Sequence, residues 1–82
     1  MIRILLFARL RELLGAGHIE IEHCADETAS ELVQRLVLNF GEGWQVLSEA
    51  DTHIAVNQKL TSAQHCLCDG DEVAFFPPVT GG

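Results

Sequence analysis

The 82 residues suffice for one domain, and their net charge of −7, from 12 acidic and 5 basic side chains, excludes a surface suited to nucleic acid or anionic membrane and favours a basic protein partner. Apolar residues make up 48% of the chain, as in an ordinary folded domain, and no apolar run is long enough to span a bilayer. The three cysteines lack the spacing of a disulfide framework, which predicts a reducing, cytoplasmic location.

Residues 2–7 are almost all apolar and predict a buried strand. Alternation gives this strand two faces, one with Ile2, Ile4 and Leu6 and the other with Arg3, Leu5 and Phe7. Arg3 marks the second face as the solvated one. Leu5 and Phe7 are then apolar side chains on an exposed face, which requires an explanation.

A short helix and a second strand follow. Residues 8–14 are rich in helix formers, and Gly15-Ala16-Gly17 ends the helix, whose predicted inward face consists of Leu10, Leu13 and Leu14. Residues 18–22 alternate as a half-buried strand does, with Ile19 and Ile21 inward. Because the connection is too short for a full crossover helix, we expect this strand to pair antiparallel with the first.

One long helix is predicted in the middle of the chain. Thr28 and Glu31 form a capping-box pattern at its start, and Asp26 and Glu27 add favourable charge there. Gly41 is its expected end. Its predicted inward face consists of Leu32, Val33, Leu36, Val37 and Phe40.

The remaining elements are a helical turn over 44–47 with Trp44 on the core, a strand over 53–56, a short extended piece around Leu60 and a strand over 72–76. Residues 57–59 and 69–71 have the composition of turns. The order strand, strand, helix, strand, short strand, strand predicts an α+β, β-grasp (ubiquitin-like) domain over residues 1–76. In that fold one helix covers one face of a mixed sheet, and the first and last strands lie side by side.

The open face of such a sheet explains the exposed apolar residues of the first strand. In the last strand, alternation leaves Ala74 and Phe76 on the same face. Phe7, Phe76 and Leu60 are therefore expected to form an apolar patch, which is typical of a partner surface. Arg11 lies next to this patch in the sequence and is a second candidate contact.

The last six residues predict an extended segment outside the domain: Pro77, Pro78, Val79, Thr80, Gly81 and Gly82. The prolines end the strand because they lack backbone N–H donors. The β-branched pair favours extended backbone, and the two glycines fit a channel too narrow for side chains. An unpaired carboxylate without nearby side chains suits an enzyme that uses the terminus itself as a substrate.

The run from Asp69 to Gly82 closely resembles the end of the small subunit of molybdopterin synthases, a family of ubiquitin-like sulfur carriers. Other segments resemble the opening and third strand of that family: Ile2–Leu6, Phe7-Ala8, Arg11-Glu12-Leu13 and Ala55-Val56-Asn57-Gln58. The resemblance implies that an ATP-dependent, ubiquitin-activating-like adenylyltransferase adenylates the carboxylate of Gly82. A sulfur donor of the cysteine desulfurase or rhodanese type then makes a thiocarboxylate, whose sulfur passes to cyclic pyranopterin monophosphate to form the dithiolene of molybdopterin.

The resemblance also implies a heterotetramer of two small and two large subunits, with the catalytic residues in the large subunit. No cofactor is expected to bind this chain stably, because the ATP is used by the partner enzyme. Gly82 is the residue expected to carry the chemistry. The expected partner contacts are Phe7, Arg11, Leu60, Phe76, Pro77, Pro78, Val79, Thr80 and Gly81.

Three alternatives remain open: a sulfur carrier for another thio-product such as thiamine, a ubiquitin-like modifier joined to lysines through Gly82, and a plain binding module. The residues leading into the two glycines argue against the thiamine type. His23-Cys24 and His65-Cys66-x-Cys68 offer ligands for a soft metal. Their spacing is not that of a zinc knuckle, so no metal site is predicted.

Overall fold

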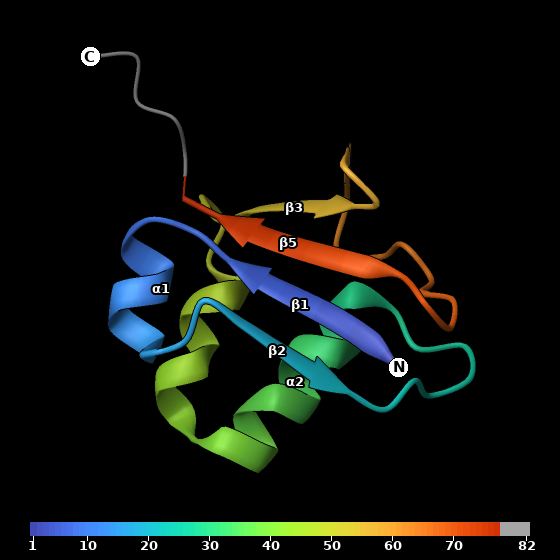
Figure 1. The fold of residues 1–82 in the computed structure, drawn as a ribbon, viewed down its shortest axis with the longest axis horizontal. Coiled ribbons are helices and arrows are strands. Elements are labelled where there is room, and N and C mark those ends of the chain that lie inside the picture. The colour runs from blue at the N-terminus through green and yellow to red at the C-terminus, as the bar shows by residue number, and fades with distance from the viewer. Residues whose placement is uncertain (78–82) are drawn as a thin grey trace.

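The centre of the fold is a pair of strands from opposite ends of the chain (Figure 1). The computed structural model describes residues 1–77. Strand β1 (Ile2–Leu6) runs parallel to strand β5 (Glu72–Phe76), with Ile4 beside Val73. The predicted contact between the first and last strands is therefore confirmed.

Three further strands extend this pair to a five-stranded mixed sheet in the order β2-β1-β5-β3-β4. Strand β2 (His18–Ile21) is antiparallel to β1, β3 (His53–Val56) is antiparallel to β5, and β4 (Lys59–Thr61) is antiparallel to β3. Asn57 and Gln58, with φ of 52° and 71°, form the left-handed turn that a tight hairpin between β3 and β4 requires. The predicted β-grasp architecture is confirmed.

Helix α2 (Ala29–Phe40) begins with the predicted capping box. The backbone N–H of Glu31 donates to Oγ1 of Thr28 at 3.2 Å, and the backbone N–H of Thr28 donates to the Glu31 carboxylate at 2.9 Å. These two bonds satisfy backbone donors that have no partner inside the helix. At the other end, the N–H of Gly41 donates to the carbonyl of Val37 at 2.8 Å, and the chain turns away with φ of 114° at this glycine.

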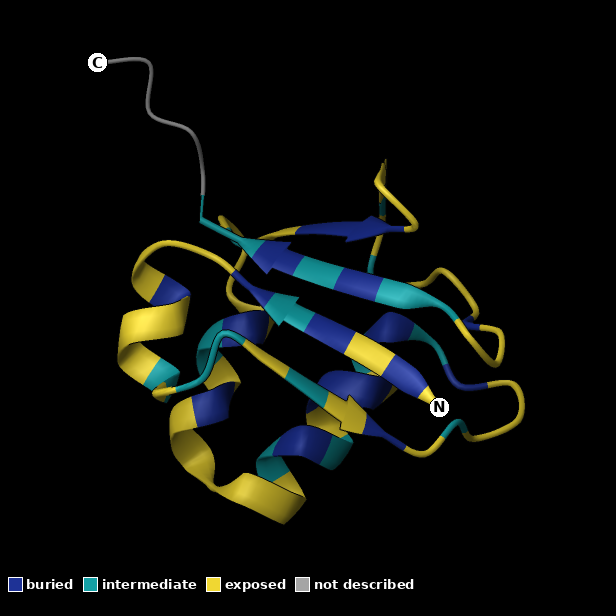
Figure 2. Cartoon of the chain, in the orientation of Figure 1, coloured by how far each residue is buried: buried dark blue, intermediate teal, exposed yellow. Residues whose placement is uncertain are grey.

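The core lies between α2 and one face of the sheet. Its sheet side consists of Ile2, Ile4, Leu6, Val73 and Phe75, each at most 1% exposed. Its helical side consists of Leu32, Val33 and Leu36 of α2 with Trp44 and Leu47 of the 3-10 helix η1 (Glu42–Ser48). Figure 2 shows how β5 alternates between buried and half-buried residues, as a strand covered mainly on one face does.

Two predicted inward residues lie outside the core. Leu13 in helix α1 (Arg9–Leu14) is 60% exposed, whereas Leu10 is buried and Leu14 packs on the core. This prediction was wrong because one narrow side of the six-residue helix faces inward, and Leu10 and Leu14, four positions apart, occupy it. Phe40, the last residue of α2, is 52% exposed and packs its ring on Trp44, with centroids 5.1 Å apart.

An ion pair fastens the β2–α2 connection to the helix. Glu27, predicted as a favourable charge at the helix start, is 8% exposed and accepts two hydrogen bonds of 2.9 Å from the guanidinium of Arg35. Nη2 of Arg35 also donates to the carbonyl of Glu22 at 2.6 Å. The hydrogen-bonded carboxylate of Glu27 raises the pKa of Arg35 above its usual value. Arg35 of α2 and its two acceptors, Glu27 and the carbonyl of Glu22, form a clamp. This clamp ties the segment between β2 and α2 to the body of the helix.

Helix α2 has 12 residues, and across residues 1–77 no helix combines the length and apolar character needed to cross a membrane.

We predict that Phe75→Ala lowers the free energy of unfolding by about 3–5 kcal/mol, because it leaves a cavity under a side chain that is 0% exposed. Urea denaturation measures this change. Leu38→Ala is the matched control: Leu38 is 84% exposed on α2, and its loss should change stability by less than about 0.5 kcal/mol. Equal losses in the two variants would contradict the placement of the core.

Candidate functional site

Within the described chain, α2 and η1 cover the inner face of the sheet and leave the other face open (Figure 1). One row of this open face crosses all five strands in register: His18, Leu5, Ala74, Ala55 and Leu60. We call it the central row. Its members on β5 and β3, Ala74 and Ala55, are small, so the face is low there and another molecule can approach the strands closely. Leu60, at the edge, is 72% exposed.

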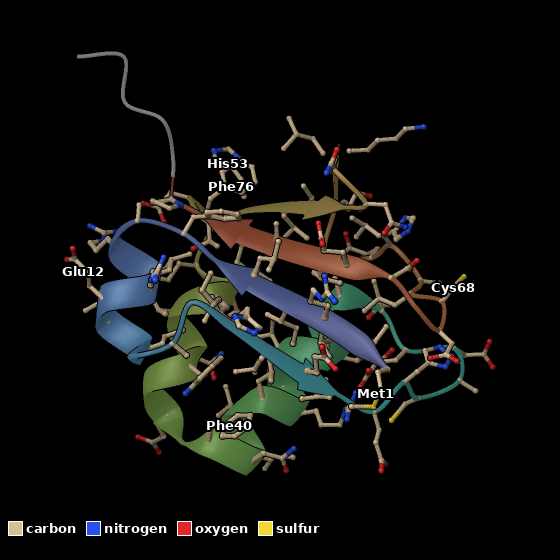
Figure 3. The ribbon with its side chains drawn as sticks, viewed as in Figure 1. Met1, Glu12, Phe40, His53, Cys68 and Phe76 are labelled. Atoms are coloured by element: carbon tan, nitrogen blue, oxygen red, sulfur yellow. The ribbon has the colours of Figure 1, made fainter. Side chains whose placement is uncertain are left out.

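A second row lies where β1 and β5 end, and we call Phe7, Phe76 and His53 the ring row. The N–H of Phe7 donates to the carbonyl of Phe75 at 3.2 Å, which continues the parallel ladder and brings Phe7 beside Phe76. On the other side, His53 pairs with Phe76 in the antiparallel ladder. Figure 3 shows their rings together; the centroids are 5.5 Å apart and the ring planes differ by 28°.

The opposite end of the open face is charged. Arg3 lies between Glu20 on β2 and Glu72 on β5, with a nitrogen of its guanidinium 3.9 Å from a carboxylate oxygen of each. These side chains are mostly well exposed, so the pairs contribute little to stability. The apolar part of the face therefore extends from the central row to the end from which Pro77 leaves β5.

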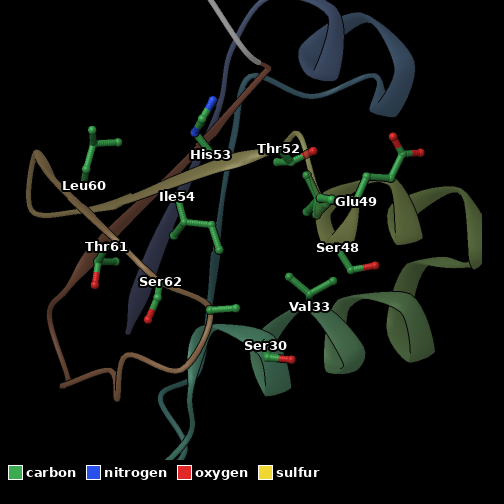
Figure 4. A pocket seen from close by; sticks show the side chains of 13 residues that line it. Ser30, Val33, Ser48, Glu49, Thr52, His53, Ile54, Leu60, Thr61 and Ser62 are labelled. Carbon is green, nitrogen blue, oxygen red and sulfur yellow. The ribbon is translucent and has the colours of Figure 1, made fainter.

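The predicted patch of Phe7, Phe76 and Leu60 divides between the two rows. Phe7, 48% exposed, and the half-buried Phe76 are neighbours, whereas Leu60 lies across Ala55 in the central row. His53 connects them, because it stacks on Phe76 and lines a groove of about 390 Å³ together with Leu60 (Figure 4). The lining of this groove is mixed: Val33 of α2 and Ile54 of β3 are apolar, whereas Ser30 and Ser62 are polar.

Arg11 lies on helix α1, close to Phe7 in the sequence, and its role as a partner contact stays a prediction. Its guanidinium lies against Gly17, where an added Cβ would come within 3.1 Å of Cζ. Together with Glu12 and Ala8, the residue that follows Phe7, it lines a shallow hollow at α1. Pro77 follows β5 directly and is half-buried. The predicted contacts Pro78, Val79, Thr80 and Gly81, and the predicted sulfur-carrying residue Gly82, lie outside the described residues.

The cysteines are exposed free thiols at Cys24, Cys66 and Cys68. Among residues 1–77, the side chains of His, Cys, Asp and Glu form no group of three or more that could hold a metal ion. The described open face consists of apolar and aromatic side chains with one charged end. It suits the binding of a protein surface.

His53 was missed by sequence reasoning. It lies two residues before Ala55 on the same face of β3, which an alternation argument could have shown. Its stacking on Phe76 depends on the register between β3 and β5, and a single sequence does not give that register.

The model of the ThiS family matches residues 4–82. The chain is 45% identical to the molybdopterin synthase sulfur carrier subunit of Escherichia coli K12 and 39% identical to that of Haemophilus influenzae. Both alignments cover all of this chain and all of the relative.

Solved structures also resemble this chain over nearly all of its length. SAMP1 from Haloferax volcanii aligns with a TM-score of 0.81 at 24% identity, over 99% of this chain and 98% of that one. A putative molybdopterin converting factor subunit 1 from Pyrococcus furiosus aligns with a TM-score of 0.76 at 31% identity, covering 95% and 97%. A protein–protein complex of subunits 1 and 2 of the molybdopterin-converting factor from Helicobacter pylori contains a chain with a TM-score of 0.64 at 26% identity, covering 99% and 97%.

We predict that the double variant Phe7→Ser, Leu60→Ser keeps its free energy of unfolding within about 1 kcal/mol of the parent, because the two residues are already 48% and 72% exposed. Urea denaturation of the single and double variants checks this. A loss as large as that of a core substitution would mean that the open face contributes to folding and is not free for a partner.

Proposed function

This chain belongs to the ThiS family, and we propose that it is the sulfur-carrier subunit of a molybdopterin synthase, with Gly82 as the residue that carries sulfur. The full-length identity of 45% to such a subunit carries the proposal. The open face adds support, because its apolar end lies where the chain leaves β5 towards Gly82.

The first step activates a poor acyl donor. An oxygen of the Gly82 carboxylate attacks the α-phosphorus of ATP, and pyrophosphate leaves. The terminal sulfur of a persulfide on a donor of the cysteine desulfurase or rhodanese type then attacks the acyl adenylate and displaces AMP, which gives an acyl disulfide. A second thiol reduces this S–S bond, so that a terminal thiocarboxylate is released and the thiol forms a disulfide with the donor. A partner adenylyltransferase binds the ATP, and the carrier itself requires no bound cofactor. This step takes place in the cytoplasm.

The second step uses the thiocarboxylate as a sulfur nucleophile. The large synthase subunit holds cyclic pyranopterin monophosphate, and the sulfur displaces an oxygen substituent from a carbon of this precursor to form a thioester with Gly82. Water then cleaves the thioester, which leaves the sulfur on the pterin and restores the Gly82 carboxylate. Two transfers supply the two sulfurs of the dithiolene. The complex of subunits 1 and 2 from Helicobacter pylori supports a large-subunit partner, and we extend this to an assembly of two small and two large subunits.

The described face supplies the docking surface in this scheme. Phe7, Phe76 and Leu60 remove their remaining apolar surface from water when a partner covers them. Full burial of an exposed side chain of this size contributes about 1.5–3 kcal/mol, and the already half-buried rings contribute part of this. The alanines of the central row allow close approach. The net charge of −7 favours a partner with a basic surface and speeds their encounter.

The alternatives have less support. The likeness to SAMP1, at 24% identity, concerns the fold, which sulfur carriers and protein modifiers share. The relatives at 45% and 39% identity are both synthase sulfur carriers. We therefore favour molybdopterin over thiamine as the destination of the sulfur, and sulfur transfer over attachment to lysines.

We predict that the adenylyltransferase, ATP and a sulfur donor replace one terminal oxygen of the wild-type chain by sulfur. Intact-mass spectrometry detects the replacement, and the large subunit with the pterin precursor then restores the original mass. An unchanged carboxylate in the presence of active adenylyltransferase would refute the carrier function. Isopeptide-linked conjugates in place of sulfur transfer would establish the modifier.

Two variants act as controls for the terminus. Deletion of Gly82 and addition of one alanine after it should both abolish sulfur uptake, because each changes the carboxylate that the enzyme must reach. Their thermal unfolding should match that of the parent, since the core lies within residues 2–75. A large loss of stability would show that the terminus belongs to the core.

A further inference from the structure

His53 is an exposed side chain held in an ordered place. It begins β3, its Cα partner in the sheet is Phe76, and its ring stacks on that of Phe76 with centroids 5.5 Å apart. Phe76 is the last residue of β5, and Pro77 follows it. The stack therefore lies directly at the root of the segment that ends in Gly82.

The backbone that carries His53 is held by η1 on one side and by β5 on the other. Thr52, the residue before it, donates its backbone N–H to the carbonyl of Glu49 at 3.0 Å. Its Oγ1 donates to the carbonyl of Val46 at 3.0 Å, so η1 holds the first residue before the strand. The ladder with β5 holds the other side. The backbone that carries the imidazole is thus held by two elements, as a positioning group requires.

The ring row supports Phe76 on both sides. Phe7 lies beside it directly after β1, and His53 lies beside it on β3. Aromatic pairs in this range of separation attract each other beyond their shared burial. Without the imidazole, the half-buried Phe76 loses its neighbour on the β3 side and can occupy more rotamers.

We propose that His53 is a positioning residue for sulfur transfer: its stack on Phe76 orders the ring row and the direction in which Pro77 leaves the sheet before the partner binds. The proposal rests on the proposed function, because it assigns His53 a part in presenting Gly82 to the large subunit. Order that exists before binding lowers the entropy cost of docking. Loss of the stack between His53 and Phe76 therefore weakens docking and leaves the chemical step unchanged.

The experiment compares the wild type with His53→Ala, His53→Phe and His65→Ala, each first converted to the thiocarboxylate and checked by intact mass. His65 is also exposed, but it follows β4 and binds the start of α2 through its carbonyl, so it is the matched control. Steady-state sulfur transfer to the pterin precursor by the large subunit gives KM for the carrier and kcat. NMR spectra of the free carriers give the signals of Phe76 and Pro77.

His53→Ala should raise KM about 3- to 10-fold, the size expected from one aromatic pair, with kcat changed less than about 2-fold. His53→Phe should return KM to within about 2-fold of the wild type, because it keeps a ring at the stack. In the free carrier, His53→Ala should shift the NMR signals of Phe76 and Pro77, and His65→Ala should leave both in place. Thermal unfolding should be alike in all four proteins.

Different failures have different meanings. A wild-type chain that accepts no sulfur would refute the proposed function and this inference together. A functional wild type with an equally efficient His53→Ala would refute the inference alone. It is also refuted if kcat falls at constant KM, if His53→Phe is as impaired as His53→Ala, or if the signals of Phe76 and Pro77 do not move.

Discussion

The parallel pairing of β1 with β5 is the constraint on which the rest of the structure depends. Because the two strands run side by side in the same direction, both end at the same edge of the sheet. Phe7 and Phe76 meet there, and the chain leaves the sheet beside them. An antiparallel pairing would have placed the end of β1 at the other end of β5. The apolar surface and the departing segment are neighbours for this reason.

Phe75 and Phe76 show how one strand serves both the core and the surface. Phe75 is fully buried against the helical layer, whereas Phe76 faces outwards between two other strands. The helical layer covers the inner face, so stability comes from that side. The outer face keeps its apolar side chains free for another protein. Its charged end around Arg3 confines the apolar surface to one half.

Local patterns predicted the elements that depend on neighbouring residues. The capping box of Thr28 and Glu31 and the alternation of Val73 and Phe75 were both confirmed. Leu13 was misplaced because a six-residue helix has more than one plausible inward face. The stack of His53 on Phe76 and the clamp of Glu27 on Arg35 escaped prediction, since they depend on register and on loop geometry. Both contacts join residues that lie apart in the chain, and the pattern of a single sequence does not show which distant residues meet.

The place of β5 in the sheet also has a consequence for biosynthesis. The strand that is translated last among the five is the one at the centre, with β1 on one side and β3 on the other. A nascent chain that lacks residues 72–76 cannot join β1 to β3, so the sheet closes late and through contacts that are distant in the sequence. Incomplete chains that end before residue 72 therefore lack the central strand and, with it, the open face that β5 completes.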